Sequence, residues 1–136
     1  MSTLSQTVSK PDWVNDASIL QQAVYNILVG QLRMDLDPQQ IQIIFSEDAL
    51  TNYWIPAFTH RTIDPDNNYE TLEFYGDKVL SYAFSQYLRR RLGKNLNQAK
   101  GTLLINKYMS KYYQAELAQR MGLPQLIRYD SEEPKV

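Results

Sequence analysis

Apolar residues recur with the period of an α-helix over most of this chain, and no segment shows the alternation of a half-buried strand. The first helical segment covers residues 17–34, where Asp16 or Ser18 can cap the start. The same period predicts further helices over residues 38–45, 46–54, 69–91 and 98–120. We therefore expect an all-α fold.

Turn-forming residues mark the ends of these segments. Asp37 followed by Pro38 is a cap with proline at the first helical position. Residues 62–68 are rich in Asp, Asn and Pro and predict a loop. Gly93 and Gly122 follow the two long helices and predict their ends, because glycine readily adopts the left-handed conformation after a helix.

Three acids, Glu70, Glu73 and Asp77, stand at a spacing of three and then four in the helix over residues 69–91. Residues at this spacing lie on one helical face, so the carboxylates form one stripe. Such a stripe is either a solvated acidic face or, with no Cys or His cluster near, a site for a hard cation such as Mg²⁺. The apolar residues expected to face the core are Leu72, Val79, Leu80, Ala83, Phe84 and Leu88.

Composition limits the class of protein. The 136 residues are 43% hydrophobic and 21% charged, as in ordinary globular domains, and none is cysteine. This excludes disulfides, thiolate zinc sites and cysteine nucleophiles. We expect one domain over residues 17–130, a flexible lead-in over 1–16 in which Trp13 is an anchor, and a polar tail over 131–136. No apolar run approaches the ~20 residues of a membrane span, so we expect an intracellular, cytoplasmic protein.

Charge is unevenly distributed along the chain, although the net charge is only −1. Residues 1–77 hold eleven acids and three bases, whereas residues 78–115 hold eight bases and no acid. The acid-free segment predicts an anionic partner with salt-sensitive phosphate contacts. The alternative is that these bases pair with the acidic half of the chain. The bases expected to contact these phosphates are Arg89, Arg90, Arg91, Lys94, Lys100 and Lys107.

Residues 68–80, Asn-Tyr-Glu-Thr-Leu-Glu-Phe-Tyr-Gly-Asp-Lys-Val-Leu, resemble the signature helix of the ribonuclease III family, which cuts double-stranded RNA. Residues 57–62, 99–107 and 115–123 resemble three further blocks of that family, in the same order. The resemblance implies a helical endonuclease domain that acts in RNA processing as a homodimeric, Mg²⁺-dependent hydrolase, with Mn²⁺ as an alternative ion. It gives Glu73 and Asp77 metal-binding and catalytic roles, Glu70 a supporting role with RNA or in the dimer, and Phe74 a dimer contact.

Three residues in these blocks have other interpretations. Gly76 leaves room either for an RNA strand or for close helix packing. We interpret the lone His60 as a structural residue rather than a general base, because the segment that contains it packs under the signature helix in the resembled fold. For Phe74, the alternative to a dimer contact is a core aromatic.

The chain departs from the family pattern at Thr62, Thr71 and Tyr75. The family's second acidic pair, Asp-x-x-Glu, lies beyond the position of Arg128, and this chain stops at Val136, so we expect a domain truncated at its C-terminal end. Asp130 and Glu133 have the right spacing, but Pro134 follows them and we predict a surface tail. With half of the ligands, the chain alone should cut duplex RNA weakly or not at all. The alternative function is a catalytically silent scaffold that binds RNA or dimerises.

Overall fold

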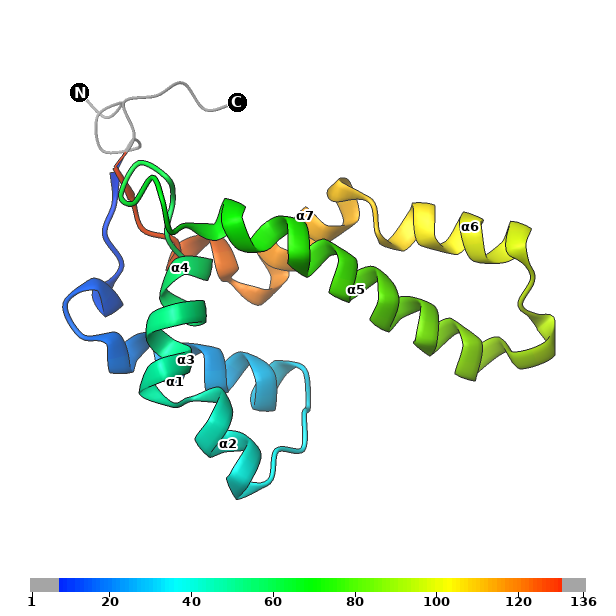
Figure 1. Cartoon of the computed structure of the whole chain (residues 1–136), viewed down its shortest axis with the longest axis horizontal. Coiled ribbons are helices and arrows are strands. Elements are labelled where there is room, and N and C mark those ends of the chain that lie inside the picture. Colours follow the sequence, from blue (N-terminus) through cyan, green and yellow to red (C-terminus); the bar gives the residue numbers. More distant parts are fainter. Residues whose placement is uncertain (1–7, 131–136) are drawn as a thin grey trace. The chain divides into compact units, whose positions relative to one another are not determined.

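The computed structural model describes residues 8–130, and helices dominate this part of the chain (Figure 1). The prediction of an all-α fold is confirmed. The chain divides into two compact units, a first unit of Met1–Leu72 with Met121–Val136 and a second unit of Glu73–Arg120. The predicted domain limits at residues 17 and 130 stay a prediction.

The first unit is built from short elements. They are β1 (Val8–Ser9), η2 (Asp12–Val14), α1 (Ala17–Tyr25), η3 (Asn26–Gln31), α2 (Pro38–Ile44), α3 (Glu47–Ala49), η4 (Leu50–Trp54), α4 (Ile55–Ala57), η6 (Leu123–Leu126) and β2 (Tyr129–Asp130). The expectation of no strand is wrong for β1 and β2, which pair antiparallel with Val8 opposite Asp130. Strands of two residues are too short to show an alternating pattern, so only the pairing reveals them.

Local signals set the helix starts in the first unit. The carboxylate of Asp16 accepts a hydrogen bond from the Ser18 backbone N–H at 3.1 Å and caps α1. Asp37 and Gln40 form a reciprocal capping box at the start of α2. The helix predicted over residues 17–34 ends earlier, because α1 continues only as the π-helical η3.

The core of the first unit joins the two ends of the described chain. Trp13 is 2% exposed, and its Nε1 donates a hydrogen bond to the Leu126 carbonyl at 2.6 Å. The Arg128 guanidinium lies 5.1 Å from the centre of the same ring. The predicted anchoring role of Trp13 is therefore confirmed. The buried residues that pack together are Trp13, Leu20, Val24, Leu50 and Phe58.

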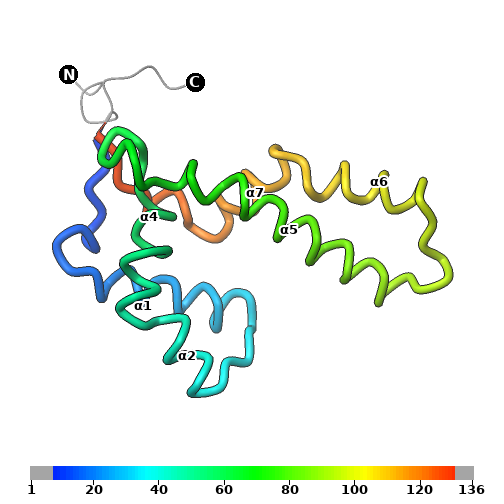
Figure 2. Tube along the Cα trace, in the orientation of Figure 1, coloured from blue at the N-terminus to red at the C-terminus, as the bar shows by residue number. Residues whose placement is uncertain are grey.

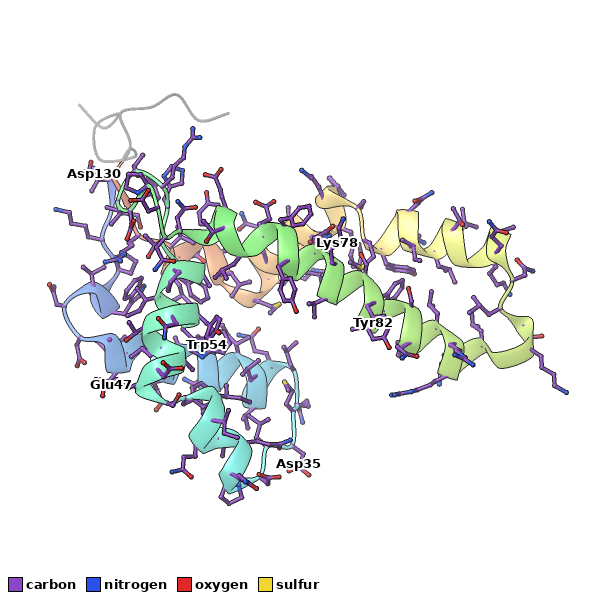
Figure 3. The ribbon with its side chains drawn as sticks, viewed as in Figure 1. Asp35, Glu47, Trp54, Lys78, Tyr82 and Asp130 are labelled. Atoms are coloured by element: carbon purple, nitrogen blue, oxygen red, sulfur yellow. The ribbon has the colours of Figure 1, made fainter. Side chains whose placement is uncertain are left out.

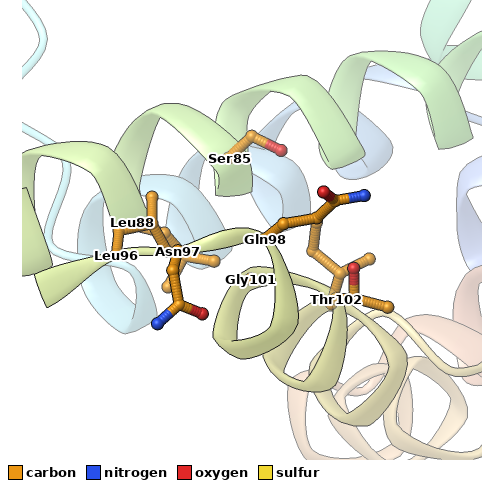
Figure 4. Close-up of a pocket in the computed structure, with 8 residues that line it drawn as sticks. Ser85, Leu88, Leu96, Asn97, Gln98, Gly101 and Thr102 are labelled. Atoms are coloured by element: carbon orange, nitrogen blue, oxygen red, sulfur yellow. The ribbon is translucent and has the colours of Figure 1, made fainter.

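The long helix α5 (Tyr69–Leu92) begins in the first unit and continues into the second. It ends at Gly93, whose φ of 51° confirms the predicted helix stop. The chain then passes through η5 (Gly93–Asn95) to α6 (Gln98–Tyr108), which runs back along the second half of α5 (Figure 2). A pocket of about 410 Å³ lies between these helices and is lined by Leu88, Leu96 and Ile105 among other uncharged residues (Figure 4).

The single helix predicted over residues 98–120 is wrong, because the chain breaks after Tyr108 and α7 (Lys111–Met121) starts afresh. Ser110 causes the restart: its hydroxyl oxygen accepts a hydrogen bond from the Tyr113 backbone N–H at 3.2 Å, and its carbonyl accepts one from Gln114. Serine is a preferred N-cap, and the apolar period alone does not show this break. Gly122, with φ of 75°, follows α7 as predicted.

Replacing Ser110 by Ala should lower the free energy of unfolding by about 1 kcal/mol, because α7 loses its cap. Urea denaturation followed by circular dichroism measures this change. Ser85→Ala is the matched control, since the Ser85 hydroxyl donates to the Ser81 carbonyl inside α5 and caps nothing. Equal destabilisation by the two substitutions would contradict the capping role of Ser110.

The predicted core face of α5 is only partly correct. Leu88 is 6% exposed, and Phe84 packs against Tyr108 with ring centres 6.0 Å apart. Val79 and Leu80, by contrast, are 51% and 46% exposed. The six residues assigned to that face span roughly 180° of the helix circumference, whereas an apolar stripe facing a core is about 100° wide. Among these residues, the stripe that contains Phe84 and Leu88 is the buried one.

Candidate metal and nucleic-acid site

The start of α5 is held in place by Asn68, which is 3% exposed. Its side-chain oxygen accepts a hydrogen bond from the Glu70 backbone N–H at 2.9 Å, and its amide nitrogen donates to the Asp64 carbonyl at 2.9 Å. The Thr71 hydroxyl donates to the Asn68 carbonyl at 2.7 Å. The loop before α5 therefore sets where the helix begins, and with it the positions of the acids that follow.

Glu73 and Asp77 lie one turn apart on α5, and both are exposed, as the sequence predicts. Within residues 8–130, neither carboxylate takes part in a salt bridge or side-chain hydrogen bond. Their stripe continues along the helix into Ser81, Phe84 and Leu88, at steps of four, three and four from Asp77. The free carboxylates thus share a helical face with the packed part of α5.

This donor set fits a hard divalent cation but does not enclose one. Carboxylate oxygens are the ligands that Mg²⁺ prefers, and the ion commonly uses one or two of them and keeps several waters. Among the described residues, no group of three or more acids or histidines is placed to hold a metal. Glu73 and Asp77 therefore provide two adjacent oxygen-bearing groups and leave most of the coordination sphere open.

Glu70 stands at the same helical spacing but has a partner of its own. Its Oε2 lies 3.8 Å from Nε of Arg61, and both side chains are about half exposed. A solvent-exposed pair of this kind contributes little to stability. The pair instead affects where the Glu70 carboxylate lies, because Arg61 draws it towards the loop that precedes α5. The supporting role of Glu70 stays a prediction.

Phe74 and Gly76 both face open space. Phe74 is 73% exposed, with Lys78 Nζ 5.2 Å from its ring centre, so the alternative of a core aromatic is wrong. A Cβ added to Gly76 would meet no atom within 4 Å. Nothing in the described part of the chain therefore requires glycine here for packing. Room for an approaching RNA strand stays the hypothesis for Gly76.

His60 is half-buried and surrounded by structural contacts. Its Nδ1 lies 2.8 Å from the Thr62 hydroxyl and accepts from the Thr62 backbone N–H at 3.2 Å. The ring centre lies 5.7 Å from that of Tyr69 and 6.1 Å from that of Tyr129. These contacts support the structural interpretation of His60.

Thr59 forms a buried connection that the sequence patterns do not predict. Thr59 is fully buried, and its hydroxyl donates to the Ile55 carbonyl at 2.6 Å and accepts from Arg128 Nε at 2.9 Å. Arg128 and His60 are also joined through the backbone, since His60 N–H donates to the Arg128 carbonyl. These hydrogen bonds connect the segment around His60 to the C-terminal end of the described residues. The only signal for this in the sequence was the presence of Thr59 in a family block.

The six bases expected to contact RNA are all exposed. Arg89, Arg90 and Arg91 form the last turn of α5, Lys94 lies in η5, and Lys100 and Lys107 lie on α6. Within the second unit as described, the salt bridge between Glu116 and Arg120 is the only one. These bases are therefore not neutralised inside their own unit. Figure 3 shows Lys78, the first base of the acid-free segment, among the side chains along α5.

Asp130, the first member of the alternative acidic pair, lies in β2 and is exposed. Its backbone N–H donates to the Thr62 hydroxyl at 3.1 Å. Asp130 is therefore not on a helix. Glu133 and the predicted tail over 131–136 lie outside the described residues.

Comparisons with known proteins show which family this region of the chain is similar to. Residues 70–135 match the family model described as the Ribonuclease III domain. A frog virus 3 protein named "Putative ribonuclease 3" is 37% identical over 79 residues, which cover 55% of this chain and 21% of the viral protein. The Ribonuclease 3 of Delftia acidovorans is 35% identical over 100 residues, covering 71% of this chain and 40% of the bacterial protein. Over this region the chain matches the ribonuclease III family.

The two matches cover only part of each relative. The chain spans about a fifth of the viral relative and two fifths of the bacterial one. No solved structure matches it significantly. Within residues 8–130, no helix combines the length and the apolar character needed to cross a bilayer.

Proposed function

We propose that this chain provides the metal-binding face of a ribonuclease III-type endonuclease that hydrolyses phosphodiester bonds of double-stranded RNA with Mg²⁺, or with Mn²⁺ in its place. The observation that carries the proposal is the pair Glu73 and Asp77. These carboxylates are exposed, unpaired among the described residues and one turn apart, on the helix where the family match begins. A solvated acidic face would leave both acids free as well, so the family match at this helix is what favours the metal site.

Each residue of the site has a distinct task in this proposal. Glu73 and Asp77 hold the ion and orient it from one helical face, and Gly76 between them leaves space for an RNA strand. When bound, the ion supplies activation of a water and neutralisation of charge on the phosphodiester. The chain's own contribution is positioning, because it presents two carboxylates on a rigid helix whose start is fixed by Asn68.

The exposed bases hold the substrate. Duplex RNA is contacted mainly through phosphates and 2′-hydroxyls rather than base edges. The segment from Lys78 to Ala115 has eight bases and no acid. It therefore presents a positive electrostatic potential to the phosphates of the RNA backbone. The three arginines at the end of α5 and the lysines of η5 and α6 are the groups we expect to contact phosphates.

The exposed side chain of Phe74 is the feature that favours a homodimer in this proposal. A phenylalanine that is 73% exposed on a helix gains free energy when a partner surface covers it. We propose that a second copy of the chain covers Phe74, so that two sites act on one duplex. Glu70, held near Arg61, would lie at the edge of this contact.

A silent scaffold is the second candidate function. The observation that favours it is the absence, within the described residues, of any group of three or more acids or histidines able to hold a metal. Such a module would keep the basic surface and bind duplex RNA without cutting it. Metal-dependent cleavage separates the two candidates.

The test of substrate class uses three labelled substrates of one sequence: duplex RNA, single-stranded RNA and duplex DNA. With Mg²⁺ a form of the protein that carries the family's second acidic pair should cut duplex RNA internally and leave the others intact, and chelation should stop the reaction; this chain alone should cut duplex RNA weakly. The length of the products on a denaturing gel shows internal cutting. Binding of duplex RNA without any cutting by the form that carries the second acidic pair, with Mg²⁺ or Mn²⁺, would favour the scaffold.

A further inference from the structure

A groove on the first unit lies apart from the acids of α5. It has a volume of about 530 Å³ and is formed by α2, α3 and η4. Its lining is largely apolar and includes Ile43, Ile44, Ala49, Tyr53 and Trp54. Trp54 is held firmly, because its Nε1 donates to the Ile44 carbonyl at 2.7 Å and its ring stacks on Phe45 with centres 6.4 Å apart.

Two large apolar side chains at this groove are exposed to solvent. Ile43 is 65% exposed and Tyr53 is 59% exposed, although the interior of the same unit buries Leu50 almost completely. Exposed apolar area next to a hollow is typical of surfaces that bind a partner. The groove therefore offers two apolar contacts that the described part of this chain leaves uncovered.

The elements that form the groove carry charge of one sign. Residues 38–54 contain two acids, Glu47 and Asp48, and no lysine or arginine. Asp48 lines the groove itself. Within the described residues neither acid forms a salt bridge. Figure 3 marks Glu47 and Trp54 in this part of the first unit. A partner that covers the apolar residues therefore meets a carboxylate at the groove.

We propose that this groove docks an amphipathic helix of a partner protein, one that has apolar anchors on one side and Lys or Arg beside them. Asp48 and its neighbour Glu47 attract cations and disfavour nucleic acid and anionic membranes. The walls are helices whose backbone groups are already hydrogen-bonded, so an extended strand would find no free edge to pair with. Apolar anchors spaced along a helix fill such a groove through side chains alone. This docking does not depend on the proposed nuclease activity.

The test uses the full chain and a synthetic helix. The probe is an amidated peptide of Leu, Lys and Ala, about 14 residues or roughly four turns long, with its Leu residues on one face. One control peptide has Glu in place of every Lys, and another has the same composition with Leu spread around the helix. Binding is followed by Trp54 fluorescence, because the peptides lack aromatic residues and the other tryptophan, Trp13, is 2% exposed. Backbone amide shifts in NMR spectra locate the contact.

We expect the basic amphipathic peptide to bind and to shift amides between residues 42 and 54, and the two control peptides not to bind. Ile43→Gln and Tyr53→Ser should each weaken binding about tenfold. Asp48→Asn should weaken it about threefold at low salt and hardly at all at high salt. Ile19→Gln and Asp66→Asn, at exposed positions that do not line the groove, are the matched controls and should leave affinity unchanged.

Three results would overturn the proposal. They are no binding of the basic amphipathic peptide, equal binding of the acidic or scrambled peptide, and amide shifts located outside the groove. Self-association of the protein that Ile43→Gln abolishes, in the absence of peptide binding, would make a second copy the occupant instead. Duplex RNA cleavage by Ile43→Gln should equal that of the unchanged protein, so failure of this proposal is distinct from failure of the nuclease.

Discussion

Replacing Asp77 by Asn should reduce Mg²⁺-dependent cleavage of duplex RNA at least a hundredfold. The substitution keeps the shape of the side chain and removes a negative charge from a site where two carboxylates hold the ion. Because positioning of the ion is most of what this face contributes, losing one of two ligands should remove most of the rate. Glu73→Gln should have a comparable effect for the same reason.

Single-turnover cleavage at saturating enzyme measures the loss without interference from RNA affinity. Asp66→Asn, an exposed acid in the loop before α5, is the matched control and should keep full activity. Mn²⁺-induced broadening of NMR signals near residues 73–77 gives a second readout, which should vanish in Asp77→Asn. Unchanged cleavage together with unchanged broadening in that variant would remove Asp77 from the site.

Neutralising Arg89, Arg90 and Arg91 together, by substitution with Gln, should lower the affinity for duplex RNA roughly a hundredfold at moderate salt. Each lost phosphate contact should reduce the slope of log affinity against log salt by about 1, so the slope should fall by up to 3 units. The three side chains are exposed at the end of α5 and have no acidic partner in the second unit as described. Their charge is therefore available to an anionic ligand.

Filter binding or fluorescence anisotropy across a salt series measures affinity and slope together. Arg120→Gln is a control, because Arg120 is already paired with Glu116 at 2.8 Å and should contribute little to RNA binding. An unchanged slope in the triple variant would show that the phosphate contacts lie elsewhere on the acid-free segment. Retention of the helical circular dichroism signal excludes unfolding as the cause of a loss.

Several elements could be predicted because their causes are local. Asp16 caps α1, Asp37 opens α2 with a capping box, and Gly93 ends α5 at a positive φ. Each of these signals acts within a few residues, so it is visible in the sequence. The exposed position of Glu73 and Asp77 on one helical face follows in the same way from their spacing.

Other features depend on partners distant in the chain. The burial of Trp13 requires the Leu126 carbonyl, and the pairing of β1 with β2 joins Val8 to Asp130. Val79 is apolar like Leu88, the buried residue of α5, yet it is half exposed, because burial depends on what covers a helical face. The break before α7 has a local cause in Ser110, but the apolar period runs through it and conceals it.

The sequence by itself determined the helical class, the family and the alignment of Glu73 with Asp77, since helix formation and family blocks are read from neighbouring residues. Tertiary structure decided which side chains have partners: Glu70 meets Arg61, Thr59 meets Arg128, and Glu73 and Asp77 meet none within the described chain. It also created the largely apolar groove beside Trp54. Contacts between residues far apart in sequence arise only when the chain closes on itself, and no local pattern encodes them.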